Sequence, residues 1–155
     1  MTNNFSLNIE PSPNPTDEKF ISDHLGEFNT LKAGADNHQP LNIFLRDEQG
    51  QLIGGLLGGT YWGWFVIEIL WIAEEARGHG YGQKIVQLAE QEAIKRGCRH
   101  AHLDTMSFQA PDFYIKLGYS VFGKLEDMPA GHTRYYLQKS LLFTLSRPRH
   151  LARIK

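Results

Sequence analysis

The stretch "AEEARGHGYGQKIVQLAEQEAIKRG", residues 73–97, decides the fold because a glycine-rich loop leads directly into a helix-forming pattern. Gly78, Gly80 and Gly82 alternate there, although glycine loses the most backbone freedom on folding. A helix N-terminus carries unpartnered N–H groups and a partial positive charge, and glycines let that backbone approach a bulky anion. The loop therefore predicts a pyrophosphate cradle, with Arg77 adding positive charge. The alternative is a turn that only needs positive φ angles.

Two familiar phosphate-binding loops are excluded by the residues that follow the glycines. A P-loop ends in Gly-Lys-Ser/Thr, whereas Gly82 is followed by Gln83 and Lys84. The dinucleotide fingerprint G-x-G-x-x-G requires glycine at position 83 or 85, and these positions hold Gln83 and Ile85. The loop therefore fits neither nucleotide motif.

The composition describes a protein able to form a packed core without a strong charge preference. Among its 155 residues, 41% are hydrophobic and 21% are charged, which fits one ordinary domain. The formal net charge is -1, from 16 basic and 17 acidic residues. This balance argues against nucleic acid or an anionic membrane as the main partner.

Cysteine usage and hydropathy indicate a cytoplasmic protein. Cys98 is the single cysteine and cannot form an intrachain disulfide, which favours a reducing compartment. The first residues lack the basic and apolar regions of a secretory signal. The longest apolar run, residues 64–73, is too short to cross a bilayer and contains Glu68.

Apolar periodicity and turn residues predict the element order β-α-β-β-β-α-β-α-β-β. A mixture of this kind, without an internal repeat, indicates an α/β protein. The predicted elements are a strand at 5–10, a helix capped by Asn14 and stopped by Gly34, a hairpin over 41–62 that turns at 47–50, a strand at 64–73, a helix at 82–96, a strand at 100–106, a short helix at 110–118 and strands at 119–126 and 132–141.

Two motifs together resemble those of a known superfamily. Arg77, Gly80 and Gly82 satisfy Arg-x-x-Gly-x-Gly between a strand and a helix, and "FYIKLGY" at residues 113–119 matches F-Y-x-K-x-G-F/Y. Their order and separation resemble the GNAT superfamily of acetyl-CoA-dependent N-acetyltransferases. The resemblance covers nearly the whole chain except its last dozen or so residues. The segments "SFQAPDFYIKLGY" and "PAGHTRYYLQKSL" are similar to a branch of small single-domain members.

The resemblance implies a GNAT fold over residues 1–142, followed by a basic tail at 143–155. This fold has a mixed, mostly antiparallel sheet, flanked by helices, with a V-shaped splay between the fourth and fifth strands. Acetyl-CoA is the implied co-substrate, with its pyrophosphate on the glycine loop and its pantetheine arm along the end of the preceding strand, much as a peptide adds to a strand edge. The implied cofactor-binding residues are Leu70, Trp71, Ile72, Arg77, Gly78, His79, Gly80, Tyr81, Gly82, Gln83 and Ser107, the last in place of the asparagine found in many relatives.

Acetyl transfer to an amine requires a proton acceptor and a group that assists the departing thiolate. At pH 7 only about one part in a thousand of an amine with pKa near 10 is neutral. By the resemblance, Tyr114 is the candidate acid. Glu68 and Asp104 are candidate bases, although a water-mediated base, or none, stays open. Cys98 is interpreted as a bystander, because direct attack in a ternary complex needs no cysteine nucleophile.

Two alternatives belong to other functional classes. His100, His102 and Asp104 share one strand face and resemble the H-x-H-x-D part of metallo-β-lactamase-type hydrolases. The next residue is Thr105 rather than histidine, so we predict no metal site. A catalytically silent acyl-CoA-binding module is the other alternative, against which the retained Tyr114 argues.

Aromatic residues at the hairpin end suggest an acceptor pocket. Tyr61, Trp62 and Trp64 lie at the turn into the cofactor strand, and His132 lies in the loop between the last two strands. Apolar walls with a few polar groups are the usual composition of a pocket. Packing of the hairpin against the core is the alternative. The acceptor is expected to be a small-molecule or peptide amine, and exposed sheet ends are compatible with a homodimer.

Overall fold

A computed structural model describes residues 5–141 of the chain. The predicted basic tail therefore lies outside the described residues. The contacts divide the chain into two units, one ending at Asp36 and the other beginning at Asn37. The single domain predicted over residues 1–142 stays a prediction, and each unit is described by itself.

The first unit contains helix α1 (Pro15–Ala33), which the cap residues predicted. The Asn14 side chain accepts a hydrogen bond of 3.0 Å from the Thr16 N–H, and Pro15 opens the helix. At the other end Gly34 has a φ of 79°, and its N–H donates to the Thr30 carbonyl at 2.9 Å. The predicted helix is confirmed at both ends.

The strand predicted at residues 5–10 is wrong. These residues pair with no strand in the described part of the chain, and the side chains of Phe5, Leu7 and Ile9 are exposed. A weak apolar alternation does not suffice, because a strand requires a neighbour that pairs with its backbone groups.

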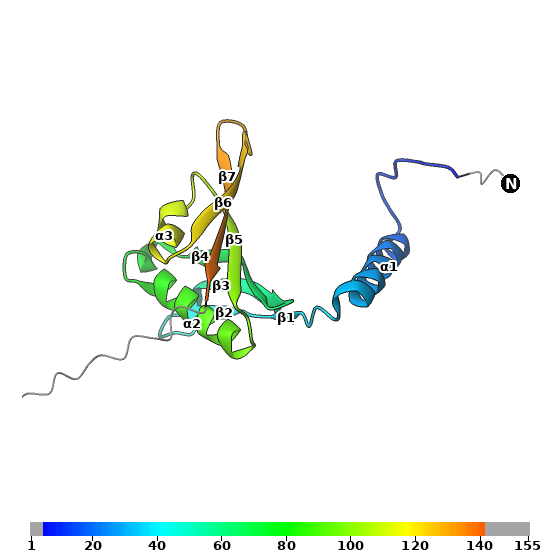
Figure 1. The fold of residues 1–155 in the computed structure, drawn as a ribbon. Helices are drawn as coiled ribbons and strands as arrows, with labels where there is room; N and C mark the ends of the chain where they lie inside the picture. The colour runs from blue at the N-terminus through cyan, green and yellow to red at the C-terminus, as the bar shows by residue number, and fades with distance from the viewer. Residues whose placement is uncertain (1–4, 142–155) are drawn as a thin grey trace, which may run out of the picture. The chain divides into compact units, whose positions relative to one another are not determined.

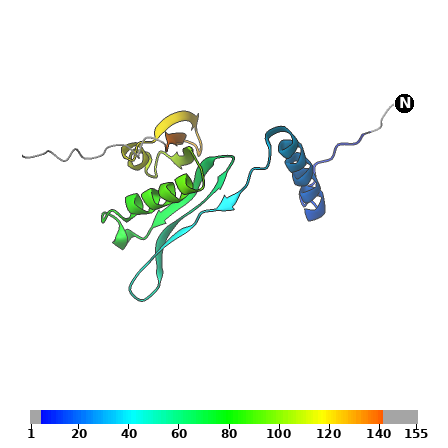
Figure 2. The same cartoon turned by 60° about the horizontal axis from the view of Figure 1, so that its bottom comes forward.

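The second unit is a mixed seven-stranded sheet covered by helices (Figures 1 and 2). Its strand order is β1-β3-β4-β5-β7-β6, with β2 also paired to β3, and β4–β5 is its parallel pair. The strands are β1 (Gln39–Pro40), β2 (Ile43–Arg46), β3 (Leu52–Tyr61), β4 (Trp64–Ile72), β5 (His100–Met106), β6 (Ser120–Glu126) and β7 (Thr133–Ser140). The helices are α2 (Tyr81–Lys95), α3 (Pro111–Lys116) and the short 3-10 helix η1 (Glu74–Ala76).

From the first hairpin onward the predicted elements are confirmed to within a residue or two. The turn between β2 and β3 is held by the Asp47 carboxylate, which accepts from the N–H groups of Gln49 at 2.9 Å and Gln51 at 2.8 Å. The short β1 was not predicted, because two residues with a proline leave no periodic pattern.

The sheet opens between β4 and β5. Their pairing runs from Trp64 opposite His100 to Ile67 opposite Leu103, after which both strands continue without pairing to each other. Glu68 marks the divergence, because the register with β3 shifts there and leaves this residue without a Cα partner. The predicted V-shaped splay is confirmed, and it creates the space for a site.

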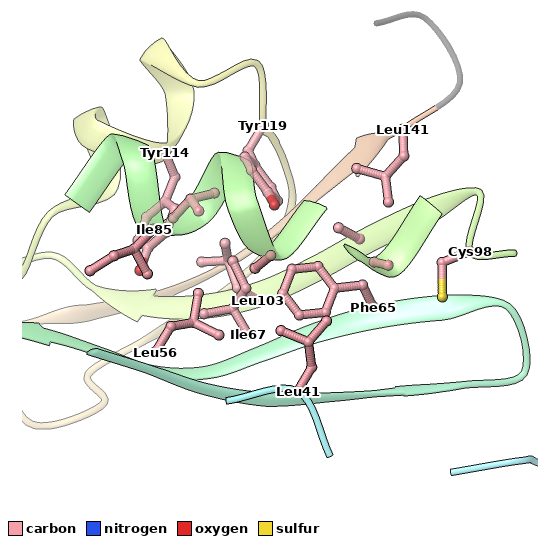
Figure 3. Close-up of a cluster of buried hydrophobic side chains, with 14 of the residues drawn as sticks. Leu41, Leu56, Phe65, Ile67, Ile85, Cys98, Leu103, Tyr114, Tyr119 and Leu141 are labelled. Carbon is pink, nitrogen blue, oxygen red and sulfur yellow. The ribbon is translucent and has the colours of Figure 1, made fainter. Parts of the chain in front are cut away.

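One face of the sheet packs against α2 and α3 (Figure 3). The buried side chains of α2 recur at helical spacing, and Leu56, Phe65 and Leu103 are the fully buried sheet residues beneath them. Cys98 is buried in the same cluster, and burial raises the pKa of its thiol, which disfavours the reactive thiolate. Within residues 5–141, no helix has the length and apolar character needed to cross a membrane.

Candidate functional site

A pocket of about 550 Å³ occupies the opening between β4 and β5. All three candidate catalytic residues, Glu68, Asp104 and Tyr114, line it. The complete lining is Ile67, Glu68, Ile69, Leu70, Trp71, Ile72, Arg77, Asp104, Thr105, Phe108, Gln109, Ala110, Phe113 and Tyr114. The splay therefore brings together side chains that the sequence distributes over two strands and a short helix.

A second pocket, of about 460 Å³, lies over the glycine loop and continues the first. The two pockets share five lining residues: Leu70, Ile72, Arg77, Ala110 and Phe113. We call the combined space the groove. It runs from the open end of the β4–β5 pair to the N-terminus of α2.

The glycine loop is exposed and shaped by backbone angles that favour glycine. Gly78 and Gly80 have φ values of 75° and 78°, in the left-handed region. The first helical hydrogen bond of α2 runs from the Lys84 N–H to the Gly80 carbonyl at 3.1 Å, so the N–H groups just before Lys84 precede the helical ladder. This end of α2 carries the donors and the partial positive charge that a phosphate needs.

Gly82 meets a different requirement, which is close packing. A Cβ at this position would lie 3.2 Å from Cζ of Phe113 and 3.4 Å from Cδ1 of Ile72. Glycine thus lets α2 begin tightly against α3 and β4. The exposed amides and the compact helix start together form a cradle that fits a diphosphate group.

Arg77 links the loop to the end of β4. Its Nε donates a hydrogen bond of 2.9 Å to the Ile72 carbonyl, and its exposed side chain lines both pockets of the groove. The bond fixes the guanidinium beside the cradle, where its remaining N–H donors can meet an anion.

Most of the predicted cofactor residues line the groove, and two do not. Leu70, Trp71, Ile72, Arg77, Gly78, Gly80, Tyr81, Gly82 and Gln83 contribute to its walls. His79 is exposed beside Tyr81 and belongs to neither pocket. Ser107 also lines neither pocket. Its hydroxyl oxygen accepts a 3.1 Å hydrogen bond from the Thr133 N–H.

The side chains of β4 change faces at Glu68, where strict alternation would not predict it. Strict alternation places Leu70 on the same face as Trp64 and Val66. The bulge reverses this, because Leu70 pairs with Leu56 and packs against the core, whereas Trp64 and Val66 lie on the opposite face. Glu68 itself is exposed at the bulge and lines the groove.

Tyr114 is a buried residue whose hydroxyl is directed toward the groove. Its side chain is 8% exposed, and it makes no hydrogen bond to another described residue. Since no fully buried side-chain oxygen among residues 5–141 lacks a partner, this hydroxyl must reach the space of the groove. Burial, with a smaller effect of the Asp104 charge, raises the pKa of Tyr114 to about 12. The phenol is therefore protonated at neutral pH and available as a donor.

Asp104 is held by a cation. Its Oδ2 accepts a 2.7 Å hydrogen bond from Nε of Arg134 on β7, and this ion pair raises the pKa of Arg134. The guanidinium also lies 5.5 Å from the Tyr136 ring centroid. Asp104 is therefore held in place at the edge of the groove by its ion pair with Arg134.

The predicted acceptor residues separate into two places. Tyr61, Trp62 and Trp64 line another pocket of about 470 Å³, whose complete lining is Tyr61, Trp62, Trp64, His102, Phe122 and Gln138. His132 does not belong to it. Its ring packs against Phe108, a residue of the groove, at 4.8 Å between centroids.

The histidines of the metal alternative have other partners. His100 stacks on Trp64 at 4.6 Å between centroids, and Nε2 of His102 lies 3.0 Å from the Tyr61 hydroxyl oxygen. In the part of the chain that the structure describes, no three His, Cys, Asp or Glu side chains form a group that could hold a metal ion. The metal-dependent hydrolase therefore finds no support in this geometry.

Sequence reasoning missed the residues between β5 and α3. Phe108, Gln109 and Ala110 line the groove, and the Gln109 side-chain oxygen accepts from the Met106 N–H at 2.8 Å and the Thr105 hydroxyl at 3.1 Å. A signal existed, because a segment between a strand end and a helix that closes the site is a usual place for binding residues.

Comparisons with known proteins agree with this fold. The profile of the Acetyltransferase (GNAT) family matches residues 6–119. Acetyltransferase Atu2258 of Agrobacterium fabrum is 36% identical over 122 residues, which are 79% of this chain and 89% of that protein. The Blasticidin-S acetyltransferase of Streptomyces morookaense is 36% identical over 107 residues, which are 66% of this chain and 79% of that protein.

A solved structure shows the same architecture. An acetyltransferase from Bacillus cereus has a TM-score of 0.79 and 31% identity, and the match covers 86% of this chain and 97% of that one. The overall fold is thus shared with this acetyltransferase over nearly its whole length. The chain belongs to the GNAT family of acetyltransferases.

Proposed function

We propose that the protein transfers the acetyl group of acetyl-CoA to a primary amine by direct attack in a ternary complex. The observation that carries this proposal is the continuous groove, which connects an anion cradle at α2 to Tyr114 and two carboxylates at the open strand pair. A protein of the same fold from Bacillus anthracis, 20% identical, was solved in complex with acetyl coenzyme A.

The chain's own residues have separate tasks along the groove. Gly80, Gly82 and Arg77 would hold the diphosphate. The end of β4, which is open on the side that faces β5, would bind the amide-bearing arm as an added strand. Acetyl-CoA supplies the acetyl group as a thioester, so a C–N bond forms, the C–S bond breaks and the amine proton is finally balanced on the sulfur.

Tyr114 would assist the leaving group as a hydrogen-bond donor. With a pKa of about 12, it is a much weaker acid than a thiol, whose pKa is near 8.5. Full proton transfer to a thiolate would cost about 5 kcal/mol, whereas donation of a hydrogen bond from a positioned phenol costs no ionisation.

Glu68 would accept the amine proton, directly or through one water. It lies exposed at the bulge and faces the groove without an ion-pair partner among the described residues, whereas Asp104 is bound to Arg134. Comparing Glu68→Gln with Asp104→Asn tests this assignment. Glu68→Gln should abolish the acidic limb of the pH dependence of kcat/KM. If the acidic limb persists in this variant, Glu68 is not the base.

The acceptor is proposed to be a small-molecule amine. The name of the Streptomyces relative gives blasticidin S as its substrate, which favours a small molecule over a protein for this chain too. We further propose a cytoplasmic protein, since acetyl-CoA is a cytoplasmic metabolite, with a homodimer as one assembly to test.

Calorimetric titration with acetyl-CoA, followed by an amine panel with free-thiol detection, tests the proposal. We expect micromolar to submillimolar affinity and thiol release that depends on the amine. Tight binding without amine-dependent release would instead indicate a silent acyl-CoA-binding module. Absence of binding would remove both.

A further inference from the structure

The turn between β3 and β4 contains an unexpected residue. Trp62 and Gly63 are its two central positions, with φ values of 43° and 76°. A two-residue hairpin turn with both φ angles positive is the type that Asn-Gly or Gly-Gly forms readily. A bulky aromatic residue is strained in this region, so its presence needs a reason other than the turn.

The pocket beside this turn supplies such a reason. Trp62 is 45% exposed and lines the 470 Å³ pocket together with Trp64 from β4 and Phe122 from β6. The complete lining comes from five strands, β3 to β7, and the turn, and a space of this size suits a small molecule. A tryptophan required only for hairpin packing would be expected to bury more of its ring.

The polar groups of this pocket are neutral. Tyr61 and His102 are hydrogen-bonded to each other at 3.0 Å, and Gln138 adds a primary amide. Burial lowers the pKa of His102, which keeps its imidazole uncharged near neutral pH. Among residues 5–141, no Asp, Glu, Lys or Arg side chain contributes to the lining. Faces of this kind stack on a flat ring, whereas a polycationic sugar would need carboxylates.

The pocket and the groove lie along one strand face. His102 of the pocket and Asp104 of the groove point to the same side of β5, two residues apart, which corresponds to about 7 Å along the strand. A ligand with its ring in the pocket could therefore extend along β5 and present an amine at the open end of the splay.

We infer that the pocket holds the aromatic part of the acceptor, so that the protein acts on amines joined to a flat ring by a flexible linker of about 7 Å. This inference rests on the proposed acetyl transfer and names its substrate class. The ring packs against Trp64 beside His102, and the amine reaches the groove at the level of Asp104.

A linker series tests the inference. The probes are benzylamine, phenethylamine, phenylbutylamine and phenylhexylamine, each compared with the alkylamine of equal chain length. We expect the ring to raise kcat/KM by about tenfold for phenylbutylamine and much less for benzylamine, whose amine cannot span the distance. The inference would be overturned if the preference for the aryl amine over the alkylamine were equal at every linker length, or if there were no such preference at all.

The informative variant is Trp62→Asn, because asparagine suits the turn and should fold at least as well as the parent. It should abolish the preference for aryl over alkyl amines while acetyl-CoA affinity stays unchanged. Phe44→Ala is the matched control, since Phe44 is an exposed aromatic residue on β2 outside all three pockets. A preference that survives in Trp62→Asn contradicts the inference.

Ligand-observed NMR with phenylbutylamine separates this inference from the proposed function. Ring contact that is lost in Trp62→Asn, without any acetylation, would support the pocket and contradict the transferase proposal. Acetylation of all amines without ring contact would support the transferase proposal and contradict the assignment of the pocket.

Discussion

Tyr114 and Tyr119 lie at the same end of α3, and their rings pack edge to face with centroids 5.9 Å apart. On the groove side, the Tyr114 hydroxyl faces the open space between β4 and β5. On the core side, the Tyr119 hydroxyl donates at 3.0 Å to Glu90. Glu90 is buried in α2 and also accepts from Lys139 of β7 at 2.7 Å.

The difference shows how this fold separates stability from function. On the core side the polar groups pair with one another, because a buried charge without a partner is costly. On the groove side, the Glu68 carboxylate and the Tyr114 hydroxyl have no hydrogen-bond or ion-pair partner among residues 5–141 and so are available to a ligand. Substitutions on the core side should therefore change stability, and those on the groove side should change binding or turnover.

The largest effect is expected at Glu90. Glu90→Gln leaves the half-buried Lys139 without its counter-ion and should lower the free energy of unfolding by about 3 kcal/mol. Urea denaturation measures the loss. The double variant Glu90→Leu with Lys139→Met should recover much of it, because it removes both charges together. Full stability of Glu90→Gln would contradict the separation.

The next effect is expected at Tyr114. Tyr114→Phe should reduce kcat about 10²-fold, because the departing thiolate loses its donor. The Kd for acetyl-CoA and the Tm should stay near their parent values, since the hydroxyl has no partner among the described residues. Tyr119→Phe is the control on the core side, where a lower Tm with parent kcat is expected. If the two variants show the same pattern, the contrast between the tyrosines fails.

A third contrast uses the glycines at the two ends of α2. Gly80 and Gly97 have φ values of 78° and 87°, and a Cβ on either meets no atom within 4 Å. Each alanine variant should therefore lose about 1 kcal/mol of stability through backbone strain. Gly80→Ala should also weaken acetyl-CoA binding about tenfold, whereas Gly97→Ala should not. Calorimetric Kd values measure this difference, and equal affinities would remove the loop from the cofactor site.

The sequence predicted the elements of the second unit well because its local signals agree with its packing. Caps, turn residues and apolar periodicity point to the same boundaries in β3, β4 and α2. It failed at residues 5–10, where alternation exists without a partner strand. It also failed at Glu68, because a bulge changes the facing of every later residue of β4 and leaves no mark in the apolar pattern.

The site was predictable only where a motif fixes local geometry. The glycine loop and Tyr114 line the groove as expected, because their positions follow from one helix start and one short helix. Ser107 and His132 do not line the groove, since their surroundings depend on how the end of β5 meets the β6–β7 loop. Asp104 pairs with Arg134 across β5 and β7. These strands are neighbours in the sheet but far apart in the sequence, and periodicity does not encode such a contact.

The smallest effect concerns alkaline stability and tests the burial of Tyr114 directly. Its pKa of about 12 in the folded protein exceeds the value of about 10 for an unfolded tyrosine. Above pH 10 the unfolded chain loses this proton first, so the contribution of Tyr114 is complete below pH 10 and is lost as the pH rises toward 12. Relative to Tyr114→Phe, the parent should lose about 1 kcal/mol of stability between pH 9 and pH 11. Parallel pH profiles of the two proteins would mean that the phenol is as hydrated in the groove as in the unfolded chain, which would contradict its burial at the end of the groove.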